Sequence, residues 1–335
     1  MTTHPGPAPT ARPRGAVLLA VAVIAAVGTA LLARTFARSV IVFPSQTLTA
    51  IAVCAVFAAI GWWLLRRLNP LVPADRRSAA ACLAWGLLPA TGFAVLANGG
   101  LTSIWSRVLG LETGSAWRDA LSAPVNEELL KIAGVLLLAL ALAPRVRGPL
   151  DGFVLGAFAG FGFQVTENVI YGIQSAEATG GTGTTTTVVT FLYERFLTAL
   201  SSHWAMSALA GTGLGYLIAR RAQRWAVVRG VALIALAMAL HLFFDSPLIA
   251  TGPGGTLRAL LAFVVAMAVY LSLRHRFRRA AADHLRAHGH DPGLLRRRTR
   301  RKARRAQPDR AARRRTGEQQ RHLLTETAEY AHRTT

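Results

Sequence analysis

Eight apolar stretches of about twenty residues each limit what this 335-residue chain can fold into. A helix needs roughly 20 apolar residues to cross a ~30 Å hydrocarbon layer. Continuous apolar runs of this kind favour helices over a barrel, because a helix satisfies its backbone polar groups internally. The composition agrees, with 52% hydrophobic and 16% charged residues. We therefore predict an all-α, polytopic transmembrane bundle of about eight spans. The predicted spans are Ala16–Ala33, Leu48–Leu65, Ala79–Asn98, Ala123–Ala143, Leu150–Tyr171, Arg195–Ala219, Ala226–Ala250 and Thr256–Leu273.

The chain divides into three parts around these runs. Residues 1–15 are rich in Pro and Thr and are expected to form a flexible cytoplasmic N-terminus. The first apolar run could be a signal peptide, but it is longer than the usual apolar region of one, so we interpret it as an uncleaved span. Residues 16–273 then form the bundle, with a Gly- and Thr-rich loop expected at Gly172–Glu194. Residues 274–335 are expected to be largely disordered, with a helical stretch near His322–Tyr330.

The positive charge is unevenly distributed. The formal net charge is +22, and residues 274–335 hold 19 of the 38 Lys and Arg but only six acids. Alternate loops between the predicted spans are also richer in Arg, which predicts a multi-pass cell-membrane protein with both termini in the cytoplasm. The dense positive runs of this basic tail, Arg296–Arg305 and Arg313–Arg315, have no interleaved aromatic residues, so we expect contact of the tail with anionic lipid and no nucleic acid. The two cysteines lie inside apolar runs and offer no disulfide framework or metal motif.

Charged residues interrupt the fourth apolar run, where lipid would reject them. Glu127 and Lys131 are spaced i, i+4 and Glu128 and Lys131 are spaced i, i+3, so either carboxylate can pair with the ammonium on a helix. Such residues inside a span usually face the protein interior and serve a function. The alternatives are a helix end that reaches the headgroups, or an ion pair with only a structural role.

Other polar residues of the later spans fall at a similar depth. At a rise of ~1.5 Å per residue, Glu127 lies roughly 6 Å below the outer membrane edge and Glu167 about 5 Å below it. His203 lies about 12 Å below that edge, and His241 and Asp245 lie in the same outer half. His241 and Asp245 are spaced i, i+4, so the carboxylate can orient the imidazole. Independent ion pairs have no reason to share one level, so we predict a polar cavity.

Small residues predict that two spans approach closely. Gly152, Gly156 and Gly160 form consecutive small-xxx-small steps, which favour close helix packing. Glu167 follows seven residues after the last of them and lies on nearly the same side. The sixth span carries its own ladder at i, i+4 spacing. Its members are Arg195, Ala199, His203, Ser207, Gly211 and Gly215.

Carboxylates and imidazoles around a wet cavity suit three tasks. A carboxylate can take a proton from water while a His stabilises the intermediate of a hydrolysis. His203, His241, Glu167 and Asp245 are also suitable zinc ligands, although no HExxH motif is present. The third task is proton- or ion-coupled transport, and a non-proteolytic scaffold could keep the same charges. The polar residues lie in the outer half and we see no inverted repeat, both of which count against transport.

Three short motifs in order resemble those of the PrsW-type intramembrane proteases. They are Glu127-Glu128-Leu129-Leu130-Lys131, Phe163-Gln164-Val165-Thr166-Glu167 and His241-Leu242-Phe243-Phe244-Asp245. The resemblance covers about residues 80–273. The more distant CAAX prenyl proteases and bacteriocin-processing enzymes have patterns nearer to EExxxR, FxxxH and HxxxN. This chain departs from those patterns at all three places.

The resemblance implies an endopeptidase that cuts a single-span membrane protein near the outer face. In the family's namesake this substrate is an anti-sigma factor. It also implies catalytic roles for Glu127, Glu128, Glu167 and His241. We add His203 from its depth and face, and assign supporting roles to Lys131, Asp245 and Arg195. A mechanism that uses glutamate alone needs no cofactor and is favoured here, while a zinc-dependent one stays open.

Overall fold

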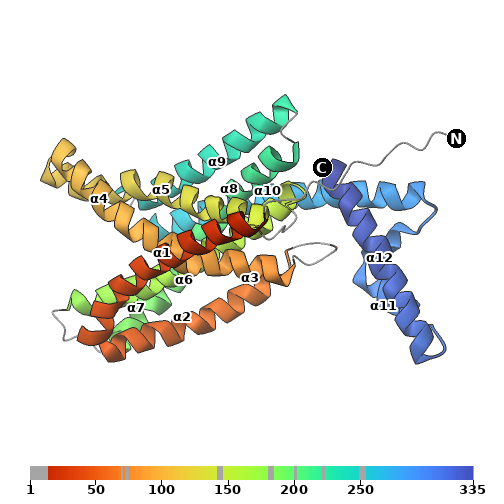
Figure 1. Ribbon diagram of the computed structural model, residues 1–335, viewed down its shortest axis with the longest axis horizontal. Coiled ribbons are helices and arrows are strands. Elements are labelled where there is room, and N and C mark those ends of the chain that lie inside the picture. The colour runs from red at the N-terminus through yellow and green to blue at the C-terminus, as the bar shows by residue number, and fades with distance from the viewer. Residues whose placement is uncertain are drawn as a thin grey trace.

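The computed structural model describes residues 14–68, 71, 75–141, 146–179, 185–199, 202–220, 223–248 and 254–334, and these residues form helices and no strands (Figure 1). The prediction of an all-α fold is confirmed. Residues 1–13 of the expected N-terminal segment lie outside the described part. The elements are α1 (Arg14–Val42), α2 (Pro44–Leu65), α3 (Arg76–Trp85), the π-helix η1 (Gly86–Ala90), α4 (Thr91–Leu109), α5 (Leu111–Ala141), α6 (Pro149–Glu177), α7 (Thr185–Ala199), α8 (His203–Arg220), α9 (Arg224–Asp245), α10 (Gly254–Ala287), the 3-10 helix η2 (Pro292–Leu295), α11 (Arg297–Arg305) and α12 (Arg310–Thr334).

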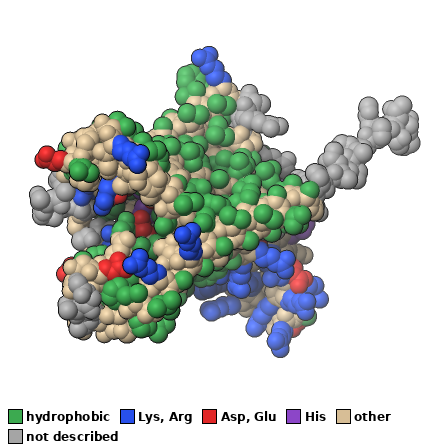
Figure 2. All heavy atoms as spheres, turned by 60° about the vertical axis from the view of Figure 1, so that its left-hand side comes forward, with side chains coloured by type: hydrophobic (Ala, Val, Ile, Leu, Met, Phe, Trp, Pro, Cys, Tyr) green, Lys and Arg blue, Asp and Glu red, His purple; other side chains and the backbone are tan. Residues whose placement is uncertain are grey.

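Six helical stretches of the described chain are long and apolar enough to cross a membrane. They are α1, α2, the continuous α3–η1–α4, α6, α9 and α10. Many large apolar side chains of the bundle are exposed, and Figure 2 shows them as a broad apolar surface. The chain is therefore a multi-pass membrane protein, but the expected count of about eight spans is not confirmed. Helix α5 carries three charged residues in its apolar part, and α8 has only 18 residues.

The predicted sixth span, Arg195–Ala219, is wrong as one continuous helix. Helix α7 ends at Ala199 and α8 begins at His203. The loop expected at Gly172–Glu194 is also mostly helical, since α6 continues to Glu177 and α7 begins at Thr185. The extension of α6 is packed, because a Cβ on Gly172 would contact Ala50 and Leu192. Packing against these neighbouring helices thus stabilises α6 beyond the end of the apolar run.

Helix α6 lies at the centre of the bundle, where 89% of its most apolar window is buried. Its glycine stripe packs directly on the backbone of α8. The predicted close approach of a neighbouring helix is therefore present, and the structure identifies that helix as α8. A Cβ on Gly160 would lie 2.5 Å from the carbonyl oxygen of His203, and one on Gly156 would collide with that of Ser207. Only glycine permits this approach. The contact places the first two turns of α8 beside the centre of the bundle.

A π-helical turn redirects the chain between α3 and α4. Pro89 lies inside this turn and has no N–H to donate, and the Thr91 hydroxyl donates to the carbonyl of Gly86 at 2.8 Å. Just before the turn, the Trp85 indole donates to the carbonyl of Leu130 on α5 at 2.9 Å. Such turns are frequent at functional sites. Here the turn connects α3 with α4. Helix α3 is hydrogen-bonded to α5 through Trp85, and α4 carries Asn98.

The basic tail differs from the largely disordered segment that we expected. Helix α10 continues to Ala287, and η2, α11 and α12 fold back from it (Figure 1). Leu324, Ala328 and Ala331 of α12 are buried in the same core as Phe277 and Leu285 of α10. The buried positions of α12 follow helical spacing, with steps of four and three residues. The helix predicted near His322–Tyr330 lies within α12.

Candidate active site

Helix α5 supplies a carboxylate pair and an ammonium that are enclosed by the protein. Lys131 and Glu128 are 0% exposed and Glu127 is 2% exposed. The Lys131 Nζ lies 3.2 Å from Glu127 Oε2 and 2.9 Å from Glu128 Oε1, so both pairings predicted from spacing are present. Because all three side chains are buried among helices, this segment is not a helix end that reaches the headgroups.

The Glu128 carboxylate is fully engaged. Its Oε2 accepts a hydrogen bond from the Ser207 hydroxyl of α8 at 2.8 Å. Its Oε1 accepts from Lys131 and lies 3.2 Å from Nδ1 of His241 on α9. Helices α5, α8 and α9 are thus tied together at this one side chain.

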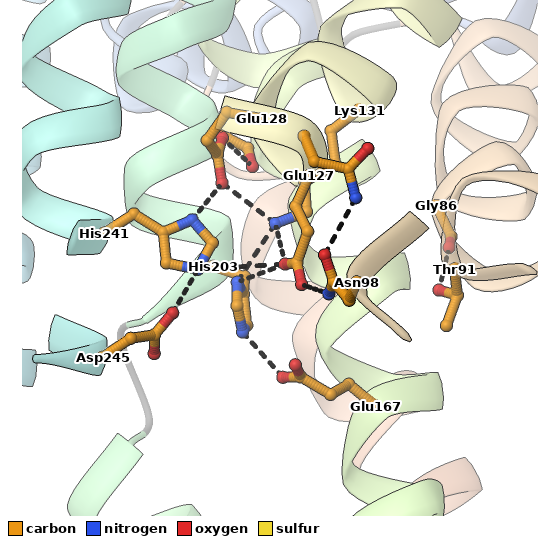
Figure 3. Close-up of polar contacts among 12 residues, drawn as sticks. Gly86, Thr91, Asn98, Glu127, Glu128, Lys131, Glu167, His203, His241 and Asp245 are labelled. Atoms are coloured by element: carbon orange, nitrogen blue, oxygen red, sulfur yellow. Dashed lines mark hydrogen bonds and ion pairs between the residues drawn. The ribbon is translucent and has the colours of Figure 1, made fainter. Parts of the chain in front are cut away.

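The Glu127 carboxylate is bound at both of its oxygens (Figure 3). Its Oε1 accepts from the Asn98 amide of α4 at 2.9 Å, and Asn126 donates to Asn98 in turn at 2.9 Å. Its Oε2 accepts from Lys131 and faces two imidazoles, at 3.8 Å from His203 Nδ1 and 3.8 Å from His241 Nε2. Both imidazole distances exceed a hydrogen bond, and the Lys131 ammonium also lies 3.1 Å from His203 Nδ1.

Each imidazole also contacts an outer carboxylate. His203 Nε2 lies 2.7 Å from Glu167 Oε2, and His241 Nε2 lies 3.2 Å from Asp245 Oδ2. The latter contact is the predicted i, i+4 pair. The two rings are 4.9 Å apart and nearly perpendicular, at 76°. Carboxylates placed in this way fix the orientation of both rings.

The outer rim of the cluster is polar. The Arg195 guanidinium of α7 lies 3.7 Å from Glu167 Oε2 and donates to the Asn168 side chain at 2.9 Å. The Tyr171 hydroxyl donates to Glu167 at 3.3 Å. The side chains of Glu167 and Asp245 are 13% and 20% exposed, so the cluster is reached from this rim.

Comparison with known families agrees with this arrangement. Residues 74–273 match the PrsW family intramembrane metalloproteases, which is more than half of the chain. The chain belongs to the PrsW family. The match begins just before α3 and ends within α10, so it contains the whole cluster and leaves out α1, α2 and the tail. Searches of curated proteins and of solved structures returned no match.

All eight site residues predicted from the sequence meet in this PrsW-family bundle, with Arg195 at the edge. The sequence analysis missed Asn98 as a site residue and gave Ser207 no role beyond the small-residue ladder. The available signal for Asn98 was its place near the end of an apolar span. The available signal for Ser207 was its i, i+4 spacing from His203.

The metalloprotease description raises the question of which residues could hold a metal. The ligand atoms of Glu127, His203 and His241 lie within 4.8 Å of one another, and two imidazoles with a carboxylate form a common catalytic zinc set. The ring nitrogens of His241 are buried without a well-directed hydrogen bond, so a ligand role is open to them. These residues fit a metal by type and spacing. Lys131 competes for the place, since its ammonium lies 3.1 Å from His203 Nδ1.

This set differs from the sequence prediction. The zinc ligands proposed from the sequence included Glu167 and Asp245 and did not include Glu127. In the structure, Glu167 and Asp245 instead contact imidazole nitrogens from the outer side. Glu167 contacts the ring nitrogen of His203 that faces away from Glu127, which is the position from which a carboxylate orients a metal-binding imidazole. Asp245 instead contacts the same Nε2 of His241 that faces Glu127.

Proposed function

We propose that this PrsW-family peptidase cleaves its substrate with Glu127 as the general base and Glu128 as a positioning residue. The observation that carries the proposal is the triangle of Glu127 Oε2, His203 Nδ1 and His241 Nε2. In the proposal the attacking water occupies this triangle, whose two 3.8 Å edges exceed a hydrogen bond, beside the Lys131 ammonium that donates to the same Glu127 oxygen. Both carboxylates contact Lys131, but Glu128 also accepts from Ser207 and lies 3.2 Å from His241, whereas no imidazole lies that close to Glu127.

In the proposed step, Glu127 takes a proton from the water held in this triangle. The water oxygen then forms a bond to the scissile carbonyl carbon, and an imidazole N–H of His203 or His241 donates a hydrogen bond to the oxyanion. The C–N bond breaks as Glu127 returns its proton to the departing amine. Lys131 keeps both carboxylates of α5 in place through the sequence of events.

A zinc ion, when bound at Glu127, His203 and His241, would polarise the scissile carbonyl and acidify a bound water. Glu167 would then orient His203 through Nε2 and Glu128 would orient His241 through Nδ1, since Asp245 contacts the same Nε2 of His241 that would face the ion. Glu167 and Glu128 make the same contacts in either case. What differs is whether Glu127 serves as base or as ligand.

The substrate and the topology are proposed on the family resemblance and the charge pattern. We propose a single-span membrane protein, in the manner of an anti-sigma factor, cut near the outer face of the membrane. Both termini of the peptidase are then cytoplasmic, as the Arg-rich loops favour. The exposed edges of Glu167 and Asp245 would face the arriving chain.

The test is cleavage of a co-expressed panel of single-span membrane proteins, combined with metal analysis of the purified peptidase. Glu127→Gln should lower the cleavage rate by roughly 10²- to 10⁴-fold. Glu112→Gln is the matched control, because Glu112 is an exposed acid on the same helix, and it should cleave like the wild type. Undiminished cleavage by Glu127→Gln would overturn the role of this residue.

Metal content separates the two roles of Glu127. If it is the base, the metal content of Glu127→Gln should equal that of the wild type. Stoichiometric zinc in the wild type, lost in Glu127→Gln but kept in Glu112→Gln, would make Glu127 a ligand and contradict the proposal.

A further inference from the structure

The basic tail forms a hollow lined by arginine between α11 and α12. The hollow has a volume of about 390 Å³ and is lined by Arg301, Arg304, Arg305, Arg313 and Arg314. The sequence predicted contact with anionic lipid somewhere along the tail. The structure instead gathers five guanidinium groups from two helices around one space.

These arginines are poorly neutralised by the protein itself. Arg314 lies 3.0 Å from the Glu318 carboxylate, but no ion pair is found for Arg301, Arg304, Arg305 or Arg313 in the described part of the chain. Like charges around one hollow repel one another and raise the local positive potential. An anion in the hollow would relieve this repulsion.

The tail hairpin that carries the hollow is docked on the end of the membrane bundle through the other end of α12. There, 18 residues after Arg314, His332 Nε2 lies 3.4 Å from Asp151 Oδ1 at the start of α6. Tyr330 stacks on His284 of α10, with ring centroids 4.4 Å apart. Figure 2 shows the Lys and Arg side chains gathered off the edge of the broad apolar surface. The leaflet on that side of the bundle therefore supplies phosphates in quantity to the tail.

We propose that this hollow binds the phosphate of an anionic phospholipid from the leaflet that faces the tail. Guanidinium groups suit the task because each can donate two parallel hydrogen bonds to phosphate oxygens. A site built from two helices would also fix the angle of the hairpin against the membrane. The proposal concerns lipid binding alone and does not depend on the peptidase chemistry.

The experiment is a titration of full-length protein in non-ionic detergent with fluorescent phosphatidylglycerol, against fluorescent phosphatidylcholine. The test variant is Arg304→Gln/Arg305→Gln/Arg313→Gln. The matched control is Arg296→Gln/Arg298→Gln/Arg315→Gln, which removes the same charge from exposed positions that do not line the hollow. Gel filtration and far-UV circular dichroism check that both variants fold.

We expect saturable phosphatidylglycerol binding that is at least about tenfold weaker in the test variant and within about twofold of wild type in the control. Equal weakening in both variants would overturn the site, because it would show general attraction by net charge. Equal affinity for free glycerol phosphate would overturn the assignment to lipid. The assignment to lipid would also be overturned if single-stranded RNA bound tighter than phosphatidylglycerol and this RNA binding were lost in the test variant only.

Discussion

The buried cluster and the basic tail handle charge in opposite ways. In the cluster a few charged groups are enclosed, and each is tied to a partner from another turn or helix. Lys131 alone touches Glu127, Glu128 and His203. In the tail, many arginines stay exposed around a thin apolar seam that joins α12 to α10. A charge is therefore expected to matter for the stability of the cluster and hardly at all for that of the tail.

The largest effect is expected when the buried ammonium is removed. Lys131→Met leaves two enclosed carboxylates without their cation and should destabilise the protein by roughly 3–5 kcal/mol. Thermal unfolding in detergent measures this change. Arg301→Met, which removes an exposed cation of the tail, is the matched control. A similar loss in both variants would end the contrast between the two regions.

A double variant sharpens this prediction. Lys131→Met combined with Glu128→Gln removes the cation and one carboxylate together, so it should recover part of the stability that the single variant loses. If the double variant is no more stable than Lys131→Met, the pairing does not account for the loss.

The next effect is a pH dependence of the tail. Burial lowers the pKa of His332 to about 4 from its usual 6.5, against the opposite pull of Asp151. Arg147 also lowers it, and Glu329 raises it. The docked state thus favours the neutral ring. Docking is fully stable above about pH 6.5 and loses up to roughly 3 kcal/mol as the pH falls towards 4.

Hydrogen exchange of residues 323–334, measured from pH 7.5 to 4.5 and corrected for intrinsic rates, follows this loss. His332→Gln should remove the pH dependence from this window. His322→Gln, an exposed His on the same helix, should leave it in place. Flat protection in the wild type across this range would contradict the prediction.

A smaller effect is expected at the contact between α6 and α8. Gly160→Ala places a methyl group 2.5 Å from the His203 carbonyl, so the helices must separate and the protein should lose roughly 1–3 kcal/mol. Because the contact positions His203, cleavage should fall as well. Gly99→Ala meets open space and should be neutral or slightly stabilising. Unfolding and cleavage measured on both variants check this.

The smallest effect is expected for exposed arginines. Arg298→Gln should change the free energy of unfolding by less than about 0.5 kcal/mol, since its side chain is exposed on α11. The melting temperature at low and high salt measures it. A loss comparable to that of Lys131→Met would mean that the tail depends on specific charge pairs.

The sequence alone determined the membrane class, the helical fold and most of the residues that meet in the buried cluster. Apolar runs and the cost of charge in lipid act locally, so Glu127, Glu128, Lys131, Glu167, His203 and His241 stand out without a structure. Glycine spacing also predicted that a neighbouring helix packs closely on α6. These signals depend on composition and on the helical period, both of which are properties of the chain.

Only the tertiary structure decided how the groups are paired. It placed Asn98 on Glu127 and Ser207 on Glu128, contacts that span 29 and 79 residues. It also broke the expected helix before His203 and folded the tail onto α10. Neighbouring glutamates have the same chemistry in sequence. They differ here because Glu128 accepts from Ser207 and lies 3.2 Å from His241, while Glu127 accepts from Asn98 and lies 3.8 Å from each of two imidazoles. That difference arises from packing between distant helices, which no local pattern encodes.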